Sequence, residues 1–281
     1  MKIKKILISQ PAPAPESKSP YFDIAEQNGI SMTFRPFIHI EGVSAKDFRK
    51  QKVDILSHSA VIFTSKTAID HFFRLCEEMR ITVPETMKYF CVSESISVYL
   101  QKYTIYRKRK VFFPPKGGAF KEMLDTCVKR HKDEKFLLLL SDISGKTMPD
   151  MMDKMKLTYT KAVLYNTVAS DMTDINIHDF DIVLFFSPQG IASLQQNFPD
   201  FEQGELKIGT FGPTTAKAVK DAGLRLDIEA PTPEAPSMTM ALDQYIKKNK
   251  KKEEQKNQLY LKDLIAQNFV ILHLIGQGAF G

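Results

Sequence analysis

Short apolar runs alternate along the chain with segments whose apolar residues recur at helical spacing, and turns rich in Ser, Thr or Gly join them. Residues 60–64 (AVIFT) and 180–186 (FDIVLFF) show the continuous apolar pattern of buried strands. The segment after the first run places Ile69, Phe72 and Cys76 on one helical face. This repeated order of strand, turn and helix predicts an α/β fold with parallel sheets covered by helices.

The stretch 207–223 shows the repeat most clearly, as a strand, a tight turn and a helix that ends at a glycine. Pro213 suits the first helical turn, where its missing N–H has no cost. Gly212 would let a ligand approach the backbone, and Thr214 or Thr215 would cap the free amides. Free amides at a helix start favour an anion. An ordinary turn between a strand and a helix fits the same residues.

Two segments have an extended pattern and no helix of their own. Residues 31–40 contain Pro36, which favours an edge strand or a connector between domains, and residues 158–168 form a second such segment. We expect residues 34–40 and 158–168 to pair as two connectors. A chain of 281 residues is long enough for two domains.

Composition narrows the classes of function. The chain is 43% hydrophobic and 26% charged, which is typical of a globular protein. Its net charge of +6 owes much to the lysine-rich segment 247–256, and no basic face with interleaved aromatic residues indicates nucleic-acid binding. The three cysteines without a CxxC motif favour a reducing cytosol, and we find neither a secretory signal nor an apolar run long enough to span a bilayer.

The polar turns are the candidate site, because ligands of parallel sheets bind outside the carboxyl ends of the strands. These turns offer hydroxyls and amides and are poor in Asp, Glu and His, so they predict hydrogen bonds to a ligand and no metal site. The six histidines lack metal-ligand spacing, and no GxSxG motif or cysteine at a strand end supplies a nucleophile. The turn residues are Thr64, Ser65, 93–95, 117–118, Ser141, Ser187 and 212–215.

Five short motifs, in order over about residues 1–247, resemble those of the uroporphyrinogen-III synthase family. No single motif is specific, but their shared order is, and the match is better in the second half of the chain. The motifs are Phe63-Thr64-Ser65, Tyr165-Asn166-Thr167, Phe185-Phe186-Ser187-Pro188-Gln189-Gly190, Gly212-Pro213-Thr214-Thr215-Ala216 and Pro231-Thr232-Pro233.

The resemblance implies the uroporphyrinogen-III synthase fold, with two Rossmann-like or flavodoxin-like parallel-sheet domains joined by a two-stranded linker. The first domain would be discontinuous, and the linker strands would be residues 34–40 and 158–168. A basic and apolar tail would lie outside the fold. The expected ranges are 1–37 with 168–247 for the first domain, 41–160 for the second domain, and 248–281 for the tail.

The resemblance also implies an enzyme that cyclises hydroxymethylbilane to uroporphyrinogen III in haem biosynthesis, with loss of water and inversion of ring D. Such a hydro-lyase uses no cofactor and no metal, and we expect a cytoplasmic monomer without membrane or nucleic-acid partners. Tyr165 matches the family's catalytic tyrosine, with an ordinary linker tyrosine as the alternative. The expected substrate-binding residues are Thr64, Ser65, Ser93, Ser141, Ser187, Gln189, Gly190, Gly212, Thr214 and Thr215.

Two departures from the family pattern keep other functions open. The chain has Ser9-Gln10-Pro11 where many relatives have Thr-Arg-Pro, and its turn at residues 92–96 lacks the family's Gly and Thr-Ala. Glu94 in that turn adds a negative charge. A non-catalytic ligand-binding or regulatory protein on the same scaffold is therefore the alternative. A nucleotide-sugar transferase is a third, although the chain lacks an acidic metal-binding motif.

Overall fold

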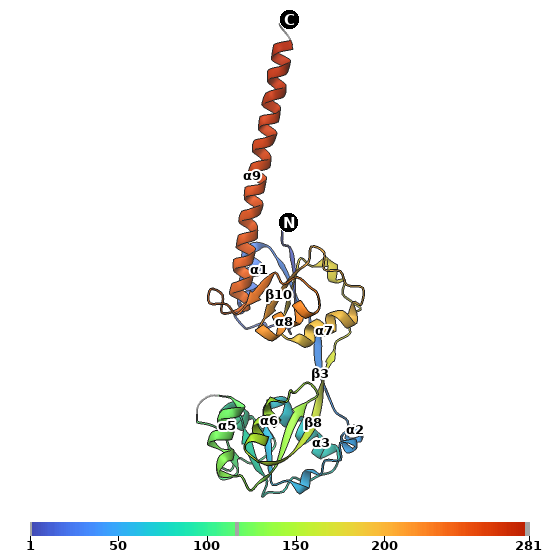
Figure 1. The fold of residues 1–281 in the computed structure, drawn as a ribbon, viewed down its shortest axis with the longest axis vertical. Coiled ribbons are helices and arrows are strands. Elements are labelled where there is room, and N and C mark those ends of the chain that lie inside the picture. Colours follow the sequence, from blue (N-terminus) through green and yellow to red (C-terminus); the bar gives the residue numbers. More distant parts are fainter. Residues whose placement is uncertain (1, 116–117, 279–281) are drawn as a thin grey trace. The chain divides into compact units, whose positions relative to one another are not determined.

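The chain forms two compact units, shown in Figure 1. The computed structural model describes residues 2–115 and 118–278, with side chains as far as residue 267. The first unit comprises Met1–Ile38 and Ala169–Gly281, and the second unit comprises His39–Val168. Each unit is built on a sheet in which parallel pairing predominates, so the predicted α/β class is confirmed.

The first unit has a five-stranded sheet in the order β11-β10-β9-β1-β2. All its strands pair in parallel. The chain builds outward in opposite directions from β1 and β9, so the switch point of the topology lies between these two strands. The strands are β1 (Lys5–Ile8), β2 (Ser31–Phe34), β9 (Ile182–Phe185), β10 (Lys207–Phe211) and β11 (Ile228–Ala230).

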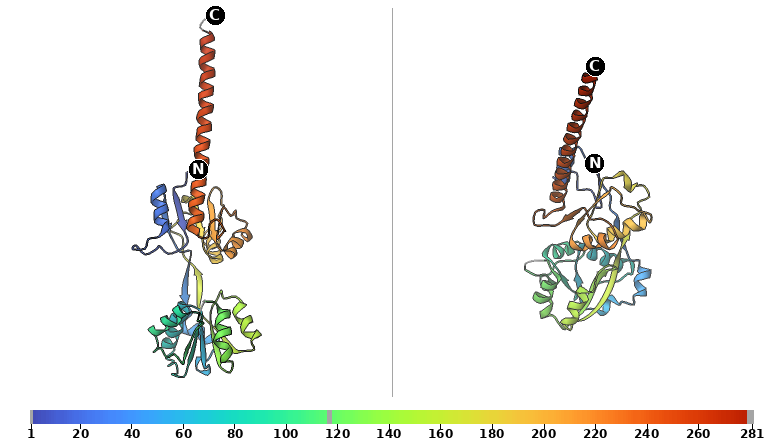
Figure 2. Two further views of the ribbon diagram at one scale, coloured as in Figure 1. Left: turned by 90° about the vertical axis from the view of Figure 1, so that its left-hand side faces the viewer. Right: turned by 45° about the horizontal axis from the view of Figure 1, so that its top comes forward.

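Helices cover both faces of this sheet because successive strand residues point to opposite sides. Ile6 and Ile8 pack in one cluster with residues of α1 and α9, whereas Leu7 packs in another with residues of α7 and α8. Figure 2 shows the two layers. The helices are α1 (Pro20–Asn28), the 3₁₀ turn η4 (Ile177–Asp179), α7 (Pro188–Asn197), α8 (Pro213–Asp221) and α9 (Met238–Gly278).

The second unit has a six-stranded sheet in the order β3-β8-β7-β4-β5-β6. Its switch point lies between β4 and β7, which pair in parallel. β3 lies at the sheet edge next to β8. The strands are β3 (Ile38–Gly42), β4 (Ala60–Phe63), β5 (Lys88–Cys91), β6 (Val111–Phe112), β7 (Lys135–Ser141) and β8 (Thr158–Ala169).

One core cluster holds this unit together, with fully buried Phe63, Phe72, Phe90 and Phe136 near its centre. Met152 is also fully buried, and the neighbouring methionines of α6 pack against the cluster, as predicted for a core-facing stripe. The helices are α2 (Ala45–Lys50), η1 (Ile55–Ser57), α3 (Lys66–Glu78), α4 (Glu94–Tyr99), η2 (Leu100–Lys102), α5 (Phe120–Thr126), η3 (Val128–Arg130) and α6 (Thr147–Lys154).

Some element boundaries differ from the prediction. The extended segment 31–40 is interrupted after Phe34, so it supplies β2 to one sheet and the start of β3 to the other. The sequence pattern predicts a strand over residues 225–229, whereas β11 starts only at Ile228. Arg225 belongs to a loop instead, because its amide donates to Gln203 Oε1 (2.7 Å) and its guanidinium binds Asp227 Oδ1 (2.8 Å).

The last helix is much longer than the sequence indicated. The sequence after residues 230–236 (APTPEAP) predicts a final helix that reaches Tyr245, whereas α9 continues to Gly278. Its first turns pack on the sheet through Leu242 and Ile246, and Figures 1 and 2 show the rest running on beyond the strands of that unit. The continuation consists of good helix formers, with no proline or glycine before Gly276, so nothing local ends the helix.

Candidate functional site

The second unit holds a cluster of polar side chains where its strands end. Ser65 follows β4 and is the N-cap of α3, where its Oγ accepts a hydrogen bond from the Ala68 amide (3.0 Å). This cap was predicted and is confirmed. Ser141 ends β7 and Ser93 follows β5, and β7, β4 and β5 are neighbours. The structure therefore brings these three predicted residues, with the half-buried Thr64, to one edge of one sheet.

Tyr165 lies at the same edge. It comes from β8, where an irregularity in the pairing of Leu140 and Ser141 places it opposite Ser141. Its hydroxyl is 3.4 Å from Ser65 Oγ. The backbone on either side is fixed by Asp142, whose amide donates to the Tyr165 carbonyl (3.2 Å) and whose carboxylate accepts from the Thr167 amide (2.9 Å). The predicted catalytic tyrosine is thus held next to two predicted binding residues.

His71 completes this cluster and was missed by sequence reasoning. Its ring stacks on that of Tyr165, with 5.3 Å between centroids and 26° between planes. Burial and the neighbouring Arg74 cation lower the pKa of His71, so the ring is neutral at neutral pH. Arg74 Nε donates to His71 Nδ1 (3.2 Å), which leaves the imidazole proton on Nε2.

Gly42 of β3 packs closely against the side chains of His71 and Arg74. A Cβ on Gly42 would lie 2.7 Å from His71 Nδ1 and from an Arg74 guanidinium nitrogen. Only glycine fits there without moving the ring. No signal in the sequence linked His71 to Tyr165, because stacking between distant segments leaves no local pattern.

Ser93 contributes differently from Ser65. It is the N-cap residue of α4, but its side chain makes no capping hydrogen bond and its Oγ lies 3.1 Å from Ser95 Oγ. Glu94 follows it in the first helical turn and is exposed. This turn therefore presents a carboxylate beside its hydroxyls.

In the first unit, the corresponding edge is formed by the turns after β9 and β10. Ser187 is the N-cap of α7, and its Oγ accepts from the Gly190 amide (3.3 Å), as expected. Gly190 is buried, and a Cβ there would lie 3.0 Å from Phe185 Cδ1, so a small residue is needed. Gln189 in the same turn is half-buried.

The turn after β10 corrects one prediction. Neither Thr214 nor Thr215 caps α8; the N-cap is Gly212, with φ 93° and ψ 146° and no side-chain cap. This backbone conformation favours glycine, and a Cβ on Gly212 would meet no atom within 4 Å. Threonine side chains at the second and third helical positions cannot replace a cap at the preceding residue. The start of α8 thus keeps amides without a side-chain partner.

Thr214 and Thr215 have different environments despite being neighbours. Thr214 is exposed, whereas Thr215 is 1% exposed. The Thr215 hydroxyl is buried and has no hydrogen-bond partner within the described part of the chain. A buried hydroxyl without a partner has a free-energy cost, which a hydrogen bond from a ligand would remove.

Two further classes of site find no support in the described residues. Over residues 2–115 and 118–278, no group of three or more His, Cys, Asp or Glu side chains is arranged to hold a metal ion. Within the same residues, no helix is both long enough and apolar enough to pass through a membrane.

Sequence comparison places the chain among known proteins. The profile described as uroporphyrinogen-III synthase HemD matches residues 20–240. The uroporphyrinogen-III synthase of Chlorobaculum parvum is 21% identical over 259 residues, which cover 87% of this chain and all of that protein. The enzyme of the same name from Saccharomyces cerevisiae is 23% identical over 210 residues, covering 66% of this chain and 75% of the yeast protein.

Solved structures agree on the fold. Uroporphyrinogen-III synthetase from Helicobacter pylori aligns with a TM-score of 0.54 at 14% identity, over 87% of this chain and 99% of that one. A mutant uroporphyrinogen III synthase from Thermus thermophilus gives a TM-score of 0.51 at 12% identity, with the same coverage. Because the profile match spans most of the sequence, the chain belongs to the uroporphyrinogen-III synthase family.

Proposed function

We propose that this chain closes hydroxymethylbilane to uroporphyrinogen III, and that Tyr165 and the polar turns at the carboxyl edges of its two sheets act on the substrate. Family membership supports the reaction. The observation that supports the residue roles is the position of the Tyr165 hydroxyl, 3.4 Å from Ser65 Oγ and beside the switch point between β4 and β7. Parallel sheets bind their ligands at such a position.

Substrate binding follows from charge. The linear tetrapyrrole carries eight carboxylates, and helix starts with free amides attract anions. In the first unit, α8 offers amides without a side-chain cap, together with the buried Thr215 hydroxyl. In the second unit, Ser65, Ser93 and Ser141 present hydroxyls on neighbouring strand ends. These groups can hold carboxylates by hydrogen bonds.

In the chemical step, the main role of the protein is to position the reacting groups. The bond between the hydroxymethyl carbon and its oxygen breaks, and the pyrrole nitrogen stabilises the electron-poor carbon that remains. The Tyr165 phenol donates a hydrogen bond to the departing oxygen, which leaves as water once protonated. The substituted carbon of ring D then attacks the electron-poor carbon to give a spiro intermediate, and the bond from that substituted carbon to its original bridge carbon breaks. The bridge carbon rebonds to the unsubstituted α-carbon of ring D, which inverts the ring, and the proton lost from that carbon balances the proton that left with the water. Holding ring D for this attack is catalysis by restriction of conformation.

His71 has a positioning role in this scheme. Its neutral ring stacks on Tyr165, and its Nδ1 is occupied by Arg74. It therefore fixes the plane of the phenol without itself exchanging a proton there. The 3.4 Å contact to Ser65 is long for a hydrogen bond between hydroxyls, so the Tyr165 proton remains available to the substrate.

We also infer a cytosolic monomer that acts on a small molecule without a nucleic-acid partner. The three cysteines are unpaired, and Cys76 and Cys91 are buried thiols, which suits a reducing compartment. Burial raises the pKa of both thiols to about 12, so they remain protonated and unreactive at neutral pH. Size-exclusion chromatography with light scattering tests the monomer.

The isomer of the product tests the proposed activity. Hydroxymethylbilane is made fresh and incubated with the chain, and the oxidised porphyrins are separated by chromatography. We expect the type III isomer, whereas the spontaneous type I isomer alone would contradict the proposal.

The alternative is a non-catalytic ligand-binding protein, and the exposed Glu94 beside Ser93 favours it. A binding experiment distinguishes this alternative from the enzyme. Calorimetry with a stable porphyrinogen analogue would then show binding by a protein that forms no type III product. Type III product in the first experiment rules this alternative out.

A further inference from the structure

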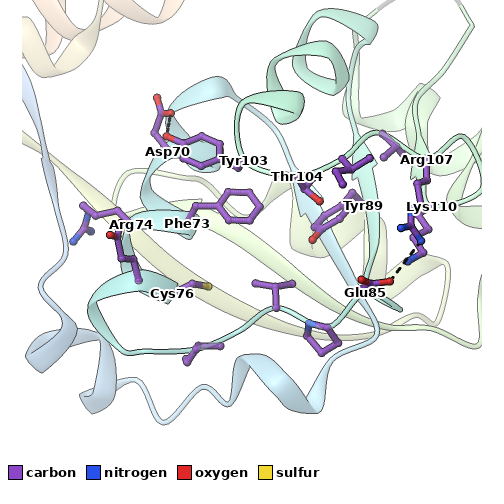
Figure 3. A pocket seen from close by; sticks show the side chains of 16 residues that line it. Asp70, Phe73, Arg74, Cys76, Glu85, Tyr89, Tyr103, Thr104, Arg107 and Lys110 are labelled. Atoms are coloured by element: carbon purple, nitrogen blue, oxygen red, sulfur yellow. Dashed lines mark hydrogen bonds and ion pairs between the residues drawn. The ribbon is translucent and has the colours of Figure 1, made fainter.

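The second unit has a cavity of about 520 Å³ that is separate from the polar edge (Figure 3). Tyr89 is the second residue of β5 and Val111 is the first of β6, so the cavity lies toward the amino ends of these strands. Tyr165 and the polar turns lie at the carboxyl ends. The lining comes from α3, the segment before β5, and the segment between η2 and β6.

One side of the cavity is aromatic. The rings of Phe73 and Tyr103 stack with 4.7 Å between centroids and 6° between planes. The Tyr103 hydroxyl donates a short hydrogen bond to Asp70, which also accepts from Tyr99, so the ring is held in place. Ile105 lines the same cavity with 79% of its surface exposed. An apolar ligand would cover this side chain.

The opposite side is basic. Figure 3 shows Arg107 and Lys110 together, across the cavity from Asp70 and Arg74. Arg107 contacts Glu85 at 3.5 Å, but the Glu85 side chain is 85% exposed, so this ion pair is weak. The Lys110 ammonium has no ion pair among the described residues.

The carboxylates of the lining do not cancel this charge. The Asp70 carboxylate lies at the other side of the cavity. It accepts hydrogen bonds from the Tyr99 and Tyr103 hydroxyls and forms an ion pair with Lys102. Glu77 comes from the last turn of α3, whereas Arg107 and Lys110 come from the segment between η2 and β6. That segment therefore presents positive charge to a ligand, across the cavity from Asp70 (Figure 3).

We propose that this cavity is a second binding site, for a small aromatic anion. Its ring would lie against Phe73, Tyr103 and Ile105, and its anionic group would bind between Arg107 and Lys110. The volume suits a molecule of this size, since small-molecule sites are mostly 300–1,000 Å³. Because the cavity has an aromatic side and a basic side, we expect it to bind an aromatic anion more tightly than a neutral apolar molecule.

Two fluorescent probes of the same shape test the charge. The anion is 1-anilinonaphthalene-8-sulfonate, and its neutral counterpart is N-phenyl-1-naphthylamine. We expect the double variant Arg107→Ala, Lys110→Ala to lower the affinity for the anion about tenfold or more, because charge-assisted hydrogen bonds are lost, and to leave the neutral probe unaffected. Arg109→Ala is the matched control, since Arg109 is exposed in the same segment but does not line the cavity.

A reporter locates the bound probe. The chain contains no tryptophan, so a single introduced one is a unique donor for energy transfer to the sulfonate. We expect saturable transfer in an Ile105→Trp variant and weaker transfer in an Ile143→Trp variant, which places the donor after β7 at the carboxyl edge of the same unit. Circular dichroism verifies that each variant is folded. Equal anion affinity in the parent and the double variant, or stronger transfer from position 143 than from position 105, would overturn the proposal.

Discussion

Tyr165 is fixed by contacts from three residues, which is why a single hydroxyl can be tested there. Ser65 approaches its oxygen, His71 stacks on its ring, and Asp142 binds its backbone. Tyr165→Phe keeps the stacking and removes only the O–H. The chain should therefore fold as before but lose the hydrogen bond to the departing oxygen.

We expect Tyr165→Phe to lower kcat about tenfold or more, as the loss of a positioned proton donor does. The matched control is Tyr159→Phe in the same strand, since the Tyr159 hydroxyl binds Asp153 (2.9 Å) at the other end of β8. That variant should keep the parent kcat. Initial rates of type III formation measure both, and equal rates for the two variants would remove Tyr165 from the mechanism.

His71 makes stability depend on pH in a defined window. Burial lowers the pKa of His71, His58 and His131 below the value of about 6.5 for a free histidine. As the pH falls through that value, the unfolded chain takes up protons that the folded chain does not. The contribution of these histidines to the free energy of unfolding is therefore fully present above about pH 7. It decreases as the pH falls from there toward the pKa values of the folded chain.

The contribution of one histidine can be isolated. We expect the free energy of unfolding from urea titrations to fall between pH 7.5 and pH 5.5, and to fall less in His71→Asn. Asparagine does not titrate, and its carbonyl oxygen can still accept from Arg74. Gln195→Asn, at an exposed residue of the first unit that does not titrate, serves as the control and should keep the parent slope. If the free energy of unfolding of His71→Asn depended on pH as steeply as that of the parent, the assignment of this contribution to His71 would be wrong.

At the scale of the element, α8 and the strand before it provide a matched pair of threonines. Thr215 in the first turn of α8 and Thr210 in β10 are both buried, and neither hydroxyl has a partner within the described residues. Replacing either by valine removes a buried polar group at nearly constant shape. Each change should therefore raise the free energy of unfolding of the ligand-free protein by between zero and about 1 kcal/mol.

Substrate binding separates the two threonines. If the Thr215 hydroxyl serves the substrate, Thr215→Val should raise KM severalfold, whereas Thr210→Val should leave KM at the parent value. Urea titrations and initial rates on the same two proteins measure both effects. A rise in KM for both variants, or for neither, would show that the Thr215 hydroxyl has no such role.

The same elements show which local features a sequence reveals. Ser65 and Ser187 were predictable as caps, because a serine directly before an apolar helical pattern has one common role. The start of α8 was predicted less well, since two threonines after Pro213 suggested a side-chain cap, whereas the N-cap position is taken by Gly212 and the threonines lie inside the helix. Dihedral angles of a turn depend on the strands that it joins, which residue type alone does not specify.

For the whole molecule, the alternation of strands and helices was sufficient to predict two parallel α/β units, because that pattern has few packed solutions. The contacts between distant segments were not predictable. The stacking of His71 on Tyr165 and the cavity beside Phe73 and Lys110 arise from how whole elements pack. The length of α9 was also missed, since a helix can continue beyond its core contacts where no residue stops it.

The two parts of α9 make different contributions, and paired truncations should show this. Leu242 and Ile246 are buried against the sheet, whereas Leu259, Tyr260 and Ile265 are each more than half exposed. Deleting residues 259–281 should leave the free energy of unfolding within about 0.5 kcal/mol of the parent, as surface changes do, and leave the yield of type III isomer unchanged.

Deleting residues 242–281 should instead destabilise the first unit by several kcal/mol, because each large buried side chain contributes about 1.5–3 kcal/mol. Urea titrations of the two truncated proteins measure the difference. If the shorter deletion cost as much as the longer one, the exposed part of α9 would belong to the folded core. If both truncated proteins were instead as stable as the parent, the contacts of Leu242 and Ile246 would contribute little.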